Sequence, residues 1–108
     1  TIQDCEVDGQ NSTSVYGIYV LNANNVVLYN PRVYNMKNTA QSTGIGATSV
    51  ENFSIFGGNI ENCPRGIYIT AGGTFNGPTT IRDVYFEPSI PMTILKYLAQ
   101  VLIWEAIS

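Results

Sequence analysis

Four copies of one short pattern lie at an almost constant spacing along this chain. Each copy has an aliphatic residue, an Asn, Asp or Gly two positions later, and a second apolar residue five positions after the first. A repeat period of this length is typical of stacked architectures, in which each unit buries its apolar side against the next. The first apolar positions are separated by 26, 27 and 26 residues and are Ile2, Leu28, Ile55 and Ile81; the second are Val7, Val33, Ile60 and Phe86.

A second element recurs between these copies, with glycine followed by isoleucine in residues 16–20, 43–47 and 65–69. These runs are short and rich in β-formers, so each repeat is predicted to carry at least two strands and no segment of helical length. The distance from the first apolar residue to this glycine varies (15, 16 and 11 residues), whereas the runs keep their length. Loops of variable length on a constant coil are expected of a solenoid.

A bend is predicted inside each copy of the first pattern. Its two apolar residues are five positions apart, an odd number, so both can face the interior only if the chain turns between them. The residue types at that turn accept a left-handed backbone: they are Asp4, Asn30, Gly57 and Asp83. A second set of turn residues follows the second apolar position by two: Gly9, Asn35, Asn62 and Pro88. Each coil is thus predicted to have three strands, with asparagine side chains stacked from coil to coil.

The chain combines the pattern hydrophobic-x-Asn/Asp/Gly-x-x-hydrophobic with a following Gly-Ile-x-Val. In this combination it resembles the right-handed parallel β-helix of the pectate-lyase-like superfamily. That superfamily includes polysaccharide lyases, polygalacturonases and the tailspike and appendage proteins of bacteriophages. The resemblance covers residues 1–88 and implies an all-β fold, a right-handed single-stranded parallel β-helix of about four coils over residues 1–90. An antiparallel sandwich and a left-handed β-helix are the alternatives, although a period near 26 disfavours the latter, which is built from hexapeptides.

The period stops in residues 91–108. Apolar residues at 94, 95, 98, 101 and 102 fit one face of a helix, with Pro91 suited to its first turn, and a strand over 101–104 is the competing prediction. The segment is too short, and too interrupted by Lys96, Gln100 and Glu105, to span a membrane. We expect it to form a helical or irregular cap over the last coil, an intersubunit contact or a membrane-surface element.

Charge and cysteine content exclude several other functions. Charged residues make up 12 % of the chain and the net charge is −3, so there is no basic footprint for nucleic acid. Cys5 and Cys63 lie two coils apart, and two strand spacings of about 4.8 Å exceed the Cα separation of about 7 Å that a disulfide allows. We therefore expect free thiols. As separate predictions, we expect neither a cofactor nor a metal.

Candidate catalytic residues are few. The chain has no histidine, which excludes catalytic triads, Cys-His pairs and His-ligated zinc within it. Glu61 and Glu87 hold equivalent positions in neighbouring coils, where stacking brings them near the separation of about 5 Å that retaining glycosidases use. The alternative is two solvated surface acids. The resemblance implies catalytic aspartates on the Gly-Ile strand, where this chain has no Asp or Glu, and so favours a non-catalytic chain.

Aromatic side chains are the main outward feature. Tyr29 and Phe56 follow their apolar anchors by one residue and should lie side by side on an outer face. Tyr19 and Tyr68 hold matching places on the Gly-Ile strands, with Gly46 between them. Flat rings beside a surface rich in Ser, Thr and Asn suit the apolar faces and hydroxyl rims of sugars. These four aromatic residues are candidate carbohydrate contacts, and packing under loops or in a subunit interface is the alternative.

Two classes of function follow from the resemblance. The first is a structural segment of an elongated spike-like protein of the phage tailspike or appendage type, homotrimeric, extracellular or part of a virion, and in contact with cell-surface polysaccharide. The second is a fragment of a secreted polysaccharide lyase or glycoside hydrolase whose catalytic coils lie outside residues 1–108. Residues 1–8 look like an internal coil, and a bare end coil would expose unpaired backbone groups, so we expect a longer parent polypeptide.

Overall fold

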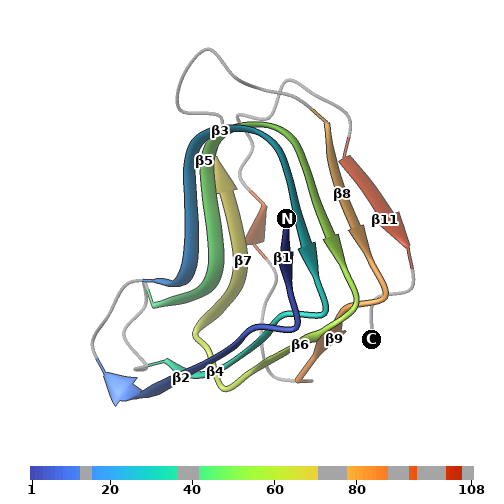
Figure 1. Ribbon diagram of the computed structural model, residues 1–108. Coiled ribbons are helices and arrows are strands. Elements are labelled where there is room, and N and C mark those ends of the chain that lie inside the picture. The colour runs from blue at the N-terminus through green and yellow to red at the C-terminus, as the bar shows by residue number, and fades with distance from the viewer. Residues whose placement is uncertain (13–15, 37–41, 71–77, 88–92, 95–101, 106–108) are drawn as a thin grey trace.

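The computed structural model describes residues 1–12, 16–36, 42–70, 78–87, 93–94 and 102–105, and all structural statements concern these residues. Every regular element among them is a β-strand, and every strand pairing is parallel (Figure 1). The prediction of an all-β fold is therefore confirmed. The antiparallel sandwich is wrong, because each strand pairs with one that runs in the same direction a repeat away.

The strands form two sheets, and the chain passes back and forth between them. A 7-stranded sheet contains β1 (Ile2–Gln3), β3 (Tyr16–Tyr29), β5 (Thr43–Phe56), β7 (Arg65–Thr70), β8 (Thr79–Arg82), β10 (Thr93–Ile94) and β11 (Leu102–Glu105). A 4-stranded sheet contains β2 (Glu6–Ser12), β4 (Arg32–Met36), β6 (Asn59–Glu61) and β9 (Tyr85–Phe86).

The long strands β3 and β5 each turn a corner without ending, and Figure 1 shows the two turning together. The corner in β3 has left-handed residues at Asn22 and Asn25, and the corner in β5 has them at Ser49 and Asn52. The strand parts before the corner, residues 16–21 and 43–48, pair in the order β3, β5, β7; we call this surface the leading face. The parts after the corner, residues 26–29 and 53–56, pair with β1 and β8 and form the trailing face.

The apolar repeat positions stack on one another as the sequence predicts. Ile2, Leu28, Ile55 and Ile81 are successive Cα partners, and so are Val7, Val33, Ile60 and Phe86. Leu28, Ile55 and Ile81 are 0 % exposed and lie in one core with Val33 and Ile60. Ile2 is exposed because β3 is its one strand neighbour in the described part of the chain.

The predicted bend is present in all four copies, with φ of 55° at Asp4, 53° at Asn30, 73° at Gly57 and 60° at Asp83. The second turn is confirmed at Asn35 and Asn62, whose φ values are 60° and 52°. In the first copy the left-handed residue is Gln10 and not the predicted Gly9. The carboxylate of Asp8 accepts a hydrogen bond from the Gln10 backbone N–H at 2.9 Å, which fixes the turn one residue later. Pro88 lies outside the described residues.

Side-chain amides at the bends and at the corner form ladders between neighbouring repeats, as predicted. Asn30 Nδ2 donates to Asp4 Oδ1 at 3.0 Å, and Asn52 Nδ2 donates to Asn25 Oδ1 at 2.7 Å. Asn62 Nδ2 donates to Asn35 Oδ1 at 2.9 Å. Each ladder satisfies polar groups that the left-handed turn brings to the surface in register.

Replacing Asn35 with Ala should lower the free energy of unfolding by about 2 kcal/mol. Alanine tolerates the left-handed backbone less well than asparagine, at about 1–2 kcal/mol, and the ladder bond from Asn62 is lost. Urea denaturation of this variant should be compared with Asn24→Ala, an exposed position outside the left-handed region. Equal unfolding midpoints for the two variants would contradict a stabilising role for the ladder.

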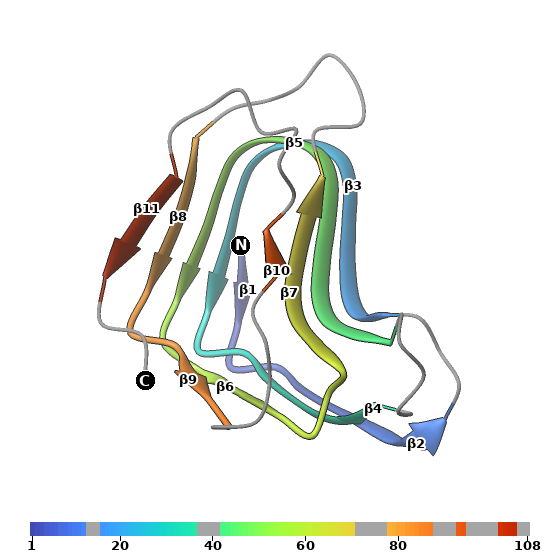
Figure 2. The ribbon, with the colours of Figure 1, turned by 180° about the vertical axis from the view of Figure 1, so that it is seen from behind.

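The two described parts of the tail are strands. β10 pairs with β7, and β11 pairs with β8 so that Trp104 is the partner of Ile81 (Figure 2). The predicted helix is therefore wrong at residues 94 and 102, and the competing strand prediction is confirmed over 102–104. The reason is that β8 offers an unpaired parallel edge, which a short apolar run such as Leu102–Glu105 can satisfy. The rest of the predicted helix lies outside the described residues.

Two smaller expectations concern the cysteines and the membrane. Cys5 and Cys63 are both free thiols, as predicted, and Cys63 is buried. Within the described part of the chain, no helix has the length and apolar character needed to cross a membrane.

Candidate functional site

The leading face carries a platform of aromatic rings that extends across neighbouring strands. Tyr19, Gly46 and Tyr68 are successive Cα partners on β3, β5 and β7, as the sequence predicts. Tyr16 stacks on Tyr19, with ring centroids 4.2 Å apart and planes 20° from parallel. The Tyr16 ring lies over Gly46, since a Cβ atom added there would collide with it. The missing side chain of Gly46 therefore makes the space in which Tyr16 lies flat between the strands.

Arg65 extends this platform on β7. Its guanidinium carbon lies 3.8 Å from the centroid of the Tyr68 ring, and its Nε donates to Thr43 Oγ1 at 3.0 Å. Tyr16, Thr43 and Arg65 are successive partners in register. The same two positions are thus used on β3 and β7: the residue three before the tyrosine stacks on its ring, as Tyr16 does on Tyr19 and Arg65 does on Tyr68.

A row of hydroxyl groups runs beside the rings. Tyr19 Oη donates to Thr48 Oγ1 at 2.8 Å, and Thr70 Oγ1 donates to Thr48 Oγ1 at 3.1 Å. Thr48 and Thr70 are Cα partners on β5 and β7, so the hydroxyls follow the strand order. Flat apolar rings next to a line of hydroxyls can contact the C–H face and the hydroxyl rim of a sugar ring at the same time.

Burial affects two ionisable groups near this part of the structure. Desolvation is the largest cause that raises the pKa of Tyr16 above its ordinary value, and the neighbouring Tyr19 is the next. The charge of Arg65 opposes them and lowers this pKa. Burial also raises the pKa of the Cys63 thiol in the core. Both groups are therefore held in the neutral form by folding, and each favours the folded state until the unfolded chain begins to ionise.

The free energy of unfolding should fall as the pH rises above about 9. A raised folded-state pKa contributes stability that is fully present below the unfolded value, 9.0 for a thiol, and is lost as the pH rises through the folded value. For one proton the slope approaches about 1.4 kcal/mol per pH unit. Urea denaturation in reducing buffer should give a constant free energy of unfolding from pH 7 to about 9 and a decline above it, and Cys63→Ala should reduce that decline below pH 10. An equal slope in that variant would contradict the assignment to Cys63.

The second predicted aromatic pair lies on the trailing face. Tyr29 and Phe56 are Cα partners with ring centroids 5.6 Å apart, so the prediction that they lie side by side is confirmed. Arg82 lies over the Phe56 ring, 5.5 Å from its centroid. The two rings are tilted by 36° to each other, whereas the stacked pair on the leading face is 20° from parallel.

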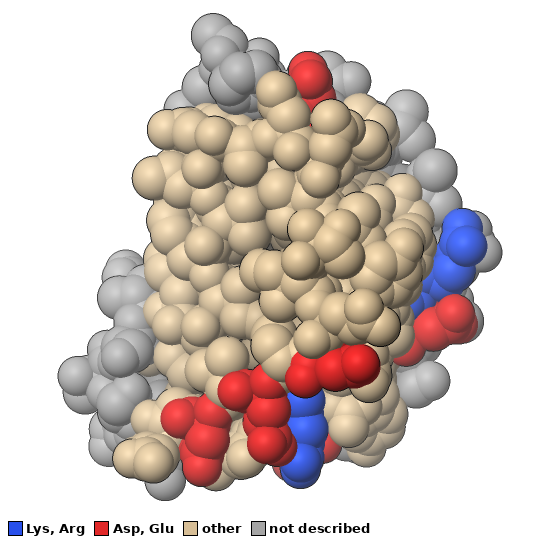
Figure 3. Space-filling view, in the orientation of Figure 1, with Lys and Arg blue, Asp and Glu red and all other residues tan. Residues whose placement is uncertain are grey.

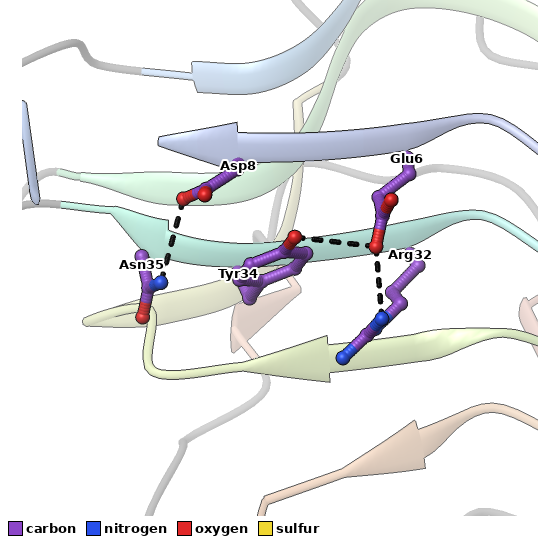
Figure 4. Close-up of polar contacts among 5 residues, drawn as sticks. All are labelled: Glu6, Asp8, Arg32, Tyr34 and Asn35. Atoms are coloured by element: carbon purple, nitrogen blue, oxygen red, sulfur yellow. Dashed lines mark hydrogen bonds and ion pairs between the residues drawn. The ribbon is translucent and has the colours of Figure 1, made fainter. Parts of the chain in front are cut away.

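Charged side chains gather on the 4-stranded sheet, along the lower edge of the molecule in Figure 3. Arg32 forms an ion pair with Glu6 at 2.8 Å, and Tyr34 Oη donates to the same Glu6 oxygen at 3.2 Å (Figure 4). Asn35 Nδ2 donates to Asp8 Oδ1 at 3.4 Å. Both partners of the ion pair are about half exposed, and such pairs contribute only about 0–1 kcal/mol. These contacts join β2 to β4 and form a structural cluster.

The two candidate carboxylates lie at the end of this sheet. The Glu87 backbone N–H donates to the Ile60 carbonyl at 3.2 Å, and Glu87 Oε2 accepts from the Asn62 N–H at 2.8 Å. The Glu87 carboxylate thus holds the turn at Asn62. Glu61 is half buried at the end of strand β6, directly before that turn. A catalytic role for Glu61 and Glu87 stays a prediction. Among the described residues, no group of acidic, Cys or His side chains is able to hold a metal.

Sequence reasoning found Tyr19 and Tyr68 but missed Tyr16, Thr48 and Arg65. The signal was present in the spacing, because Tyr16 and Arg65 each precede a tyrosine by three residues on equivalent strands. Strict alternation in a strand would place residues three apart on opposite faces, so this spacing does not suggest stacking by itself.

No protein-family model, curated protein or solved structure matches this chain. The function must therefore be inferred from the two faces and their side chains.

Proposed function

We propose that residues 1–108 are a segment of a right-handed parallel β-helix within a larger, elongated, spike-like protein, and that the leading face contacts cell-surface polysaccharide. The in-register parallel stacking of β1, β3, β5 and β8 supports the β-helix, because each coil adds one strand to every face. Crossover connections between parallel strands are almost always right-handed, and this supports a right-handed β-helix. Such a stack extends along one axis and suits a rigid spike.

The platform of Tyr16, Tyr19 and Tyr68 beside the hydroxyls of Thr48 and Thr70 is the observation that carries the carbohydrate contact. Tyr19 is 43 % exposed although it is stacked and hydrogen bonded. A ring that is fixed in place and still open to solvent loses little conformational freedom when a sugar stacks on it. The platform crosses β3, β5 and β7, so a bound glycan would run across the strands.

The same proposal makes the protein a homotrimer, extracellular or part of a virion, as in the phage tailspike or appendage type. The exposed Tyr29 beside Phe56 supports contact between copies through the trailing face. Light scattering of the chain, with and without residues 92–108, tests the assembly. A trimer would support the spike, and a stable monomer would contradict the trimeric part of the proposal.

Glycan binding is tested with Tyr19→Ala and a matched control, Tyr85→Ala. Tyr85 is exposed to the same degree, at 44 %, but lies on β9 of the 4-stranded sheet. On an array of neutral and anionic polysaccharides, Tyr19→Ala should weaken binding about tenfold, since a stacked ring contributes about 1 kcal/mol or more. Tyr85→Ala should bind as the parent chain does. Absence of binding to every glycan, or equal loss in both variants, would overturn the proposed function.

A further inference from the structure

Among the described residues of the leading face, the one charged side chain is basic. Among residues 16–21, 43–48 and 65–70, and in Thr93–Ile94 of β10 beside β7, Arg65 is the only Asp, Glu, Lys or Arg. The acidic side chains Glu6, Asp8 and Glu61 lie instead on β2 and β6 of the 4-stranded sheet. The net charge of the protein is −3, whereas the charge that Arg65 gives to the leading face is positive.

The charge of Arg65 has a fixed position on the platform. The guanidinium is held by stacking on Tyr68 and by the hydrogen bond from Nε to Thr43. Its influence reaches Tyr16, whose pKa the Arg65 charge lowers against the larger raising effect of desolvation. Arg65 thus lies within the electrostatic range of both aromatic ends of the platform, whose three strands contribute no carboxylate of their own.

We propose that the polysaccharide bound by the leading face is anionic, with an acidic group of the sugar beside Arg65 and the sugar rings on Tyr16, Tyr19 and Tyr68. This inference rests on the proposed function and names its ligand class. A guanidinium that stacking already orients loses little freedom when it meets an anion, and contacts between Arg and an oxyanion are stronger than neutral hydrogen bonds. The acidic face of the 4-stranded sheet repels the same polymer and so directs it to the leading face.

The test uses the full chain and matched pairs of polymers in the presence of a chelator. Hyaluronan and alginate supply carboxylates, their carboxyl-reduced forms are neutral with the same backbone, and dextran sulfate is compared with dextran. The protein should bind the acidic member of a pair at least about tenfold more tightly, with affinity falling as salt increases. Preference for hyaluronan or alginate assigns a carboxylate ligand, and preference for dextran sulfate assigns a sulfate ester.

Two arginine variants separate a site charge from the net charge. Arg65→Gln should remove most of the preference for the acidic polymer, whereas Arg82→Gln makes the same charge change over Phe56 on the trailing face and should leave the preference intact. Thermal unfolding of both variants verifies that they are folded. Equal binding of acidic and neutral forms, or equal effects of the two variants, would overturn the anionic ligand while leaving the proposed function in place. If the parent chain binds none of the polymers, the anionic ligand and the proposed function are both overturned.

Discussion

Ile55→Asp is expected to abolish folding. Ile55 is 0 % exposed and lies between its partners Leu28 and Ile81 in the column of apolar residues. An isolated carboxylate in that column costs several kcal/mol and also loses the burial of the isoleucine side chain, about 1.5–3 kcal/mol. Together these terms approach the whole stability of a small domain, about 5–15 kcal/mol. Circular dichroism and size-exclusion chromatography should show an unfolded or aggregated chain.

Two further variants show whether the effect belongs to the core. Ile67→Asp alters a second fully buried isoleucine, on β7, and should have the same result. Ser54→Asp adds the same carboxylate to the neighbouring position, which is half buried, and should retain cooperative unfolding within about 1 kcal/mol of the parent. A folded Ile55→Asp protein would mean that the column of apolar residues does not form the core.

The stacking of the repeats could be predicted from the sequence because two independent signals agree. The apolar residues recur at a constant interval, and the residue between them is Asn, Asp or Gly in each copy, as a left-handed bend requires. Either signal alone would allow another register. Together they place Leu28 opposite Ile55 and Val33 opposite Ile60, which are the observed partners.

The corner within β3 and β5 could not be predicted in the same way. In β5 it uses Ser49 and Asn52, and serine is a weak marker of a left-handed backbone. The tail shows a similar limit, because a short apolar run such as Leu102–Glu105 fits a helix and a strand equally well. The available edge of β8 decides between them, and that edge exists only once the other repeats have stacked.

The candidate site was predicted in part for a related reason. Register alone places Tyr19 and Tyr68 on either side of Gly46. The positions of Tyr16 and Arg65 depend on how their side chains lean, Tyr16 into the space over Gly46 and Arg65 onto Tyr68. The direction in which each side chain leans depends on local packing, and the pattern of residue types does not predict it.

Gly58→Ala is expected to destabilise the protein by about 3–5 kcal/mol, more than Gly57→Val or Gly57→Asn at the neighbouring position. A Cβ atom at Gly58 would collide with the carbonyl oxygen of Pro31, and its φ of 99° is unfavourable for any side chain. Pro31 is buried and its carbonyl accepts a hydrogen bond from the Asn59 N–H at 2.9 Å, so the oxygen cannot move without losing that bond. The close approach of two neighbouring repeats at this point therefore depends on glycine.

Gly57 provides the comparison, because it shares the left-handed backbone, with a φ of 73°, but has room for a side chain. The nearest atoms to a Cβ added at Gly57 would be 3.9 Å away, which is ordinary van der Waals contact. Gly57→Asn should be nearly neutral, since Asn30 holds the equivalent bend. Gly57→Val should cost about 1–3 kcal/mol through its backbone alone. Urea denaturation should rank the variants as Gly58→Ala least stable, then Gly57→Val, then Gly57→Asn. Native-like unfolding of Gly57→Val would contradict the bend, and a stable Gly58→Ala would contradict the contact with Pro31.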